Sequence, residues 1–189
     1  MSFYSFAKFV HIASDIGIFI GIGAQLLSLA ALRQIKRAEQ ARVLLWLITT
    51  SDVITIVSAA LTITAGLYMA LTIRGLQISW IAVSLGSLVA LLLPLIRVFV
   101  EPRMRAIVKM TRETPDGPLP QALEARIHDP ILGTALQMVA AVVFGIVFLM
   151  TVKPSLVGAL IGMLAALALG LVSGLPLWFA ARRRSTIRL

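Results

Sequence analysis

Five long apolar segments dominate the sequence, at about residues 9–32, 43–73, 79–100, 130–151 and 155–181. An α-helix needs about 20 predominantly apolar residues to cross the hydrocarbon core of a bilayer, and each segment is long enough. Only 13% of the residues are charged, whereas soluble domains have about a quarter. The sequence therefore predicts an all-α fold, a polytopic transmembrane helical bundle of five spans that forms a single domain over residues 1–189.

Lysine and arginine are unevenly divided between the two ends of the predicted bundle. With five spans, segments 33–42, 97–129 and 182–188 fall on one side and carry four, six and four of the 17 basic residues. The other side keeps Lys8, Arg74 and Lys153. Cytoplasmic loops of membrane proteins carry an excess of basic residues. We therefore expect the N-terminus outside and the C-terminus in the cytoplasm.

The net charge of +9 does not point to nucleic acid, because the basic residues are placed at the predicted membrane boundaries. Anionic lipid headgroups at the cytoplasmic face are the simplest partners for such clusters. The chain has no cysteine, which excludes disulfides, thiolate metal sites and thiol nucleophiles. It also has no P-loop and no hydrolase or metalloprotease motif, so we name no catalytic residue. The absence of these motifs favours a protein that is not an enzyme.

The predicted cytoplasmic loop, residues 101–129, is the one extramembrane segment of substantial length. Pro102 suits the first turn of a helix, and Met104, Ile107, Val108 and Thr111 then lie on one side at helical spacing, with the basic residues over the rest. This pattern predicts a short amphipathic helix lying on the membrane surface. A second short helix is expected at about 119–127, with Asp129 as the N-cap of the fourth span.

Small residues recur every four positions along the fifth span, at Gly158, Gly162, Ala166, Gly170 and Gly174. Small residues allow membrane helices to approach closely, so we expect another helix to pack along this stripe. That helix could belong to the same chain or to a partner, and we expect a homo-oligomer or a larger membrane complex. Pro94 lies inside the third span and predicts a kink there.

Two acidic residues, Asp15 and Asp52, lie within predicted spans, where a charged side chain is costly and usually faces a partner or a cavity. His11 precedes Asp15 by one helical turn, on the same helix face. If the first two spans form an antiparallel hairpin, Asp52 lies level with Gln25, and we predict a contact between them. His11, Asp15, Gln25 and Asp52 form the predicted buried polar site.

The depths of the two acids argue against a carboxylate pair, because they differ by about 12–15 Å at the rise of an α-helix. They could instead be two stations of a proton or cation path, with hydroxyls from the second span between them: Thr49, Thr50, Ser51, Thr55, Ser58, Thr62 and Thr64. Hydrogen bonds from these hydroxyls to their own helix explain the same residues equally well.

His11 is also the candidate ligand for a haem or copper site. The other histidine, His128, lies at the opposite end of the predicted bundle, which excludes a bis-histidine haem within one chain. Met69 and Met150 are predicted at the same end as His11, and a His/Met haem or copper site would suit that chemistry. Ordinary packing explains both methionines as well.

The segment Lys8-Phe9-Val10-His11-Ile12, the glycines that follow it, Glu101-Pro102-Arg103 and the ending Met150-Thr151-Val152-Lys153-Pro154 resemble a bacterial family of predicted integral membrane proteins of unknown function, over roughly residues 5–154. That resemblance implies a multi-pass protein of the bacterial inner membrane. More distantly, an early histidine followed by glycines is similar to the copper-resistance D proteins and the haem-linked protoporphyrinogen oxidases. Only His11 carries over from them. Asp15 stands where those proteins commonly have an apolar or small residue, and the second ligand of a haem site is not identifiable in this sequence.

Three functions remain open at this point. The first is a structural or accessory subunit of a membrane complex, favoured by the small extramembrane mass and the glycine stripe. The second is a haem- or copper-binding redox protein that uses His11. The third is a small proton- or cation-coupled transporter that uses Asp15 and Asp52, although the sequence shows no inverted repeat of the kind many transporters have.

Overall fold

The computed structural model describes residues 2–73 and 75–187, together with the side chains of most of them, and the regular secondary structure of that part is helical, apart from an isolated β-bridge between Arg37 and Pro118. Five of its helical rods are long and apolar enough to cross a membrane. Arg74 and Arg188, two of the basic residues used to predict the orientation, lie outside the described residues. The described helices and short helical segments are α1 (Phe3–Leu32), α2 (Ala38–Thr72), the 3₁₀ turn Gly75–Gln77, α3 (Ser79–Ser87), the π segments Leu88–Leu92 and Leu95–Val100, α4 (Glu101–Glu113), α5 (Gln121–Ile127), α6 (Pro130–Val152) and α7 (Leu156–Ile187).

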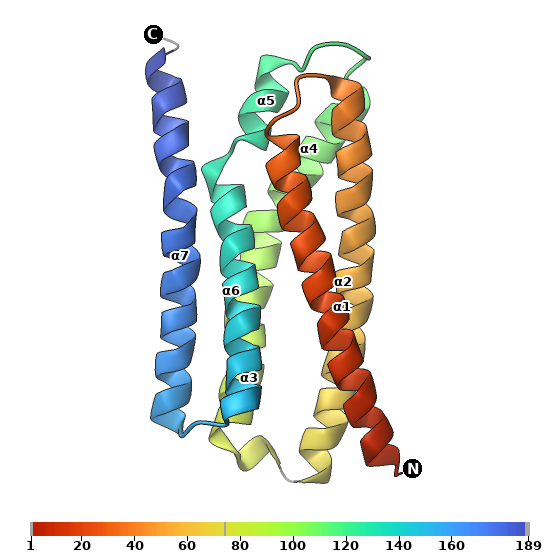
Figure 1. Cartoon of the computed structure of the whole chain (residues 1–189), viewed down its shortest axis with the longest axis vertical. Helices are drawn as coiled ribbons and strands as arrows, with labels where there is room; N and C mark the ends of the chain where they lie inside the picture. Colours follow the sequence, from red (N-terminus) through yellow and green to blue (C-terminus); the bar gives the residue numbers. More distant parts are fainter. Residues whose placement is uncertain (1, 74, 188–189) are drawn as a thin grey trace.

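The rods run side by side with the helix α5 at one end (Figure 1). The α1–α2 turn, α4, α5 and the end of α7 lie at that end, which we call the basic end, while the N-terminus lies at the opposite end. α1 and α2 form one antiparallel pair, and α6 and α7 form another. Both of the first two helices begin several residues before the predicted spans, at Phe3 and Ala38.

The third rod continues without a break from the predicted span into the predicted loop, from Ser79 to Glu113. Pro94 lies inside it and has no N–H to donate. The flanking turns, Leu88–Leu92 and Leu95–Val100, are wide π turns. The rod accommodates the proline with these wide turns, and α4 therefore leaves the span already helical.

The apolar face of α4 packs against other helices of this chain, whereas the sequence analysis expected it to rest on the membrane surface. Met104 and Ile107 are buried in a cluster that also takes residues from α1, α2, α5 and α6: Leu29, Leu32, Ala41, Leu45, Ile48, Leu123, Ile127, Leu132 and Leu136. An apolar helix face can be covered by lipid or by protein, and here protein covers it. We call this cluster, which holds the basic end together, the basic-end core.

α6 lies along the small-residue stripe of α7. A side-chain carbon at Gly170 would stand 2.9 Å from the Met138 Cα, and one at Gly174 would stand 2.5 Å from the Thr134 hydroxyl. At the level of Ala166 the facing residue is Gly145. Gly158, at the start of α7, faces only Pro154 and Ser155 of the preceding turn. The helix in the stripe therefore belongs to the same chain.

Candidate functional site

α1 and α2 approach closely because glycines of α1 face hydroxyl side chains of α2. Gly17 lies against Ser58, and Gly21 lies against Thr55 and the Ser51 carbonyl. A larger residue at either glycine would collide with these groups. The interface between the first two helices is consequently lined by small and polar groups, and we call it the polar seam.

One polar cluster of the seam gathers around His11, in the N-terminal half of α1. His11 Nδ1 lies 2.8 Å from the Thr62 carbonyl oxygen. Because a carbonyl oxygen only accepts, Nδ1 carries the hydrogen and donates it to the Thr62 carbonyl. Gly66 makes room for the ring, since a side-chain carbon there would stand 2.8 Å from His11 Cε1.

Asp15 is held by threonine rather than by histidine. Thr62 Oγ1 donates a hydrogen bond to Asp15 Oδ1 at 3.0 Å. His11 Nε2 is 3.8 Å from Asp15 Oδ2, which is too long for a hydrogen bond. The histidine and the carboxylate are therefore linked indirectly, through one residue, Thr62, that forms a hydrogen bond with each. The sequence presents Thr62 only as one of several hydroxyls along α2.

The second polar cluster lies nearer the basic end. Gln25 Nε2 donates to Asp52 Oδ1 at 2.6 Å, the contact that the depth comparison predicts, and lies 3.4 Å from Thr55 Oγ1. Thr55 in turn donates to the Ser51 carbonyl of its own helix. Gln25 is buried, so its amide is held between the two helices.

Neither carboxylate of the seam has a lysine or arginine partner among the described residues. Their direct donors, Thr62 and Gln25, are neutral. The Asp15 side chain keeps 24% of its surface exposed in the single chain. Within the described part of the chain, the direct hydrogen-bond donors of both acids are thus neutral, and the one titratable cationic group recorded near either acid is His11, at 3.8 Å from Asp15.

A different polar network joins α1 to the loop helices at the basic end. Arg33 Nε and Nη2 donate to the carbonyl oxygens of Ile127 and Asp129, at 3.3 and 3.2 Å. Asp129 accepts from the Ile131 amide as the N-cap of α6 and forms an ion pair with Arg103 at 3.0 Å. Arg33 and Arg103 therefore bind protein groups, a role that the sequence did not reveal.

His128 belongs to the same network. Its Nδ1 lies 2.9 Å from the Glu124 carbonyl oxygen, and its Nε2 lies 3.0 Å from the Arg33 carbonyl oxygen. A neutral imidazole donates only one hydrogen, so both hydrogen bonds form together only when the ring is protonated. The residue links the end of α5 to the end of α1.

A family model described as a predicted integral membrane protein (DUF2269) matches residues 5–154. The chain belongs to this family. The matched DUF2269 segment contains both clusters of the polar seam and the whole arginine network, whereas α7 lies beyond it. No curated protein and no solved structure matches the chain. The family is one of unknown function, so the function of this DUF2269 member has to be argued from its own residues.

The candidate metal ligands of this DUF2269 protein are His11, Met69 and Met150. Within the described ranges, no group of three or more histidine, cysteine or acidic side chains could hold a metal ion. Among the described residues, Asp15 is the acid recorded beside His11, at 3.8 Å. Met150 packs against the apolar cluster of Val142, Ile146, Leu149, Ala159 and Met163, and Met69 lies in the last turn of α2.

Proposed function

We propose that this DUF2269 protein is an accessory subunit of a complex in the bacterial inner membrane. The observation that carries the proposal is the pair of acids in the polar seam, Asp15 and Asp52, whose direct donors are neutral. A charged side chain near the centre of a membrane helix costs about 2.5–3.5 kcal/mol on insertion scales. A polar or basic group from a neighbouring subunit, or from a second copy of this chain, would reduce that cost.

The shape of the chain supports the same role. Most of the described residues belong to helices that are long and apolar enough to cross a membrane, and the other described segments are short turns and connections (Figure 1). Large apolar side chains such as Ile12, Ile16 and Ile56 are exposed on the α1–α2 hairpin. These surfaces suit contact with lipid and with other membrane helices.

Site-specific photocrosslinking in native membranes tests the proposal. We expect a benzophenone side chain placed at Ile16 or Ile56, on the hairpin, to form a discrete protein adduct. The same side chain at Leu164, an exposed position of α7, serves as the matched control. Replacing both acids, Asp15→Asn and Asp52→Asn, is expected to reduce the hairpin adduct and to leave the protein folded.

Two other results would count against the proposal. If the gently purified protein is a stable monomer and the hairpin positions give no more adduct than Leu164, the accessory role is wrong. An adduct that is unchanged by the two asparagine substitutions would show that the acids do not make the contact.

A second candidate function is a redox protein with a haem or copper ion at His11. The observation that favours it is the hydrogen bond from His11 Nδ1 to the Thr62 carbonyl, since metal-ligating histidines commonly donate their other ring N–H to a carbonyl. The purified protein would then have a visible absorption band or bound copper that is lost in His11→Ala and kept in His128→Ala. A colourless protein without metal would contradict it.

We also propose that the basic end faces the cytoplasm. The three basic segments meet at this end of the described structure (Figure 1), and basic loops favour the cytoplasmic side. Anionic lipids of the cytoplasmic leaflet are attracted to such a surface, by about 1 kcal/mol for each basic residue near it.

A further inference from the structure

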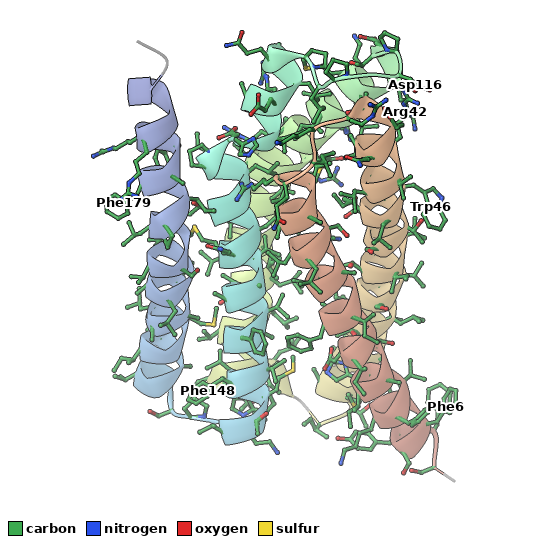
Figure 2. All side chains as sticks on the ribbon, turned by 45° about the horizontal axis from the view of Figure 1, so that its top comes forward. Phe6, Arg42, Trp46, Asp116, Phe148 and Phe179 are labelled. Carbon is green, nitrogen blue, oxygen red and sulfur yellow. The ribbon has the colours of Figure 1, made fainter. Side chains whose placement is uncertain are left out.

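A surface groove lies between α2 and α4 at the basic end. It has a volume of about 230 Å³ and is lined by Arg42, Leu45, Trp46 and Thr49 of α2 and by Val108, Thr111 and Arg112 of α4. Figure 2 shows two of these residues, Arg42 and Trp46, on the same stretch of α2, with Asp116 beside Arg42. The groove lies at the surface next to the basic-end core, to which Leu45 also belongs.

The lining of the groove is apolar over most of its length. Leu45, Trp46 and Val108 contribute apolar side chains. The two threonines add methyl groups rather than open donors, because Thr49 Oγ1 donates to the Leu45 carbonyl and Thr111 Oγ1 donates to the Ile107 carbonyl. The groove therefore offers an apolar surface to whatever fills it.

Two guanidinium groups provide the polar part of the groove. Arg42 is held in place by an ion pair with Asp116 at 2.7 Å and by the Thr114 carbonyl at 3.0 Å. Arg112 forms no hydrogen bond or ion pair within the described part of the chain. One fixed and one available positive charge beside an apolar surface complement a ligand with an anionic head and an apolar tail.

The neighbouring surface of α2 shows where such a ligand would come from. Trp46 is 67% exposed, and Val43 and Val53 on the same helix are similarly exposed. Tryptophan is enriched at the boundary between hydrocarbon and headgroups. The groove therefore begins at headgroup level and continues onto helix surface that suits lipid tails.

We propose that this groove binds one anionic phospholipid. The headgroup phosphate lies at Arg112 and Arg42, and an acyl chain lies across Leu45, Trp46 and Val108. The inference does not depend on the accessory role, because it uses residues of α2 and α4 at the basic end and none of the polar-seam acids. It also differs from general attraction of anionic lipid to a basic surface, because it assigns one site with a defined pair of arginines.

Fluorescence of Trp46 can test the site, because Trp46 forms one wall of the groove. The substitutions Trp80→Phe and Trp178→Phe leave Trp46 as the single tryptophan, since the chain has three. The protein is reconstituted in phosphatidylcholine vesicles that contain a small fraction of phosphatidylglycerol. In one series the phosphatidylglycerol carries brominated acyl chains that quench tryptophan, and in the other series an equal fraction of the phosphatidylcholine does.

We expect brominated phosphatidylglycerol to quench Trp46 more than the same fraction of brominated phosphatidylcholine, with an apparent preference of about five-fold for each arginine involved. Arg112→Gln should remove most of this preference. Lys109→Gln is the matched control, because Lys109 is an exposed basic residue of the same helix that does not line the groove.

Three results would overturn the proposal. The first is equal quenching by the two brominated lipids. The second is an equal loss of preference in Arg112→Gln and Lys109→Gln, which would indicate general surface attraction. The third is weak quenching by both lipids, which would show that a segment of protein, from this chain or a second copy, covers the groove.

Discussion

Thr62 is the residue on which the His11 cluster depends, because its carbonyl accepts from His11 and its hydroxyl donates to Asp15. The backbone fixes the first contact, whereas the side chain alone makes the second. The two contacts can therefore be separated by one substitution that keeps the shape of the residue.

We expect Thr62→Val to lower the free energy of unfolding by about 1 kcal/mol, because Asp15 loses its hydroxyl donor in a buried interface. Thermal unfolding in detergent measures the effect. Thr64→Val is the control, since Thr64 donates only to the Ala60 carbonyl of its own helix. Equal losses in the two variants would show that the Asp15 contact adds nothing.

Gln25 and Asp52 form a pair that a double-mutant cycle can measure. Gln25→Leu alone removes the amide that donates to Asp52, so we expect a loss of about 1–3 kcal/mol. Gln25→Leu combined with Asp52→Leu should cost less than the sum of the single changes, because no polar group is then left without its partner. Additive losses would contradict the contact.

At the scale of elements, the structure explains which parts of the fold could be predicted. The Gln25–Asp52 contact followed from the sequence, because an antiparallel hairpin with a short turn fixes which residues share a depth. The burial of α4 did not follow, since the face with Met104 and Ile107 suits lipid and protein equally. The hydrogen bonds of Arg33 depend on where the fold places the Ile127 and Asp129 carbonyl oxygens. No short sequence pattern predicts that position, because these partners are 94 and 96 residues away in the sequence.

The α6–α7 pair gives a prediction at the same scale. We expect Gly170→Ala to lower the unfolding free energy by about 1–3 kcal/mol, because the added methyl would stand 2.9 Å from the backbone of Met138. Gly23→Ala is the control, since nothing lies within 4 Å of that position. Thermal unfolding in detergent should show that only the first variant is less stable.

For the whole molecule, the orientation in the membrane determines which compartment each end of the bundle faces. The chain has no cysteine, so single cysteines report position cleanly. We expect Pro115→Cys, at the basic end, to resist a membrane-impermeant maleimide in intact cells and to react after lysis. Ser155→Cys, at the opposite end, should react in intact cells, and the reverse pattern would overturn the proposed orientation.

The basic-end core has a mechanical consequence for the hairpin. That core joins α1 and α2 to α4, α5 and α6, whereas the second core cluster takes its residues from the third rod, α6 and α7. Toward its N-terminus α1 diverges from α6 (Figure 1), beyond the ring contact of Phe19 with Phe144. The hairpin is therefore anchored at the basic end, by its packing against the loop helices. Any tilt of the hairpin about this anchored end would displace His11 farther than Gln25, because His11 lies farther from it.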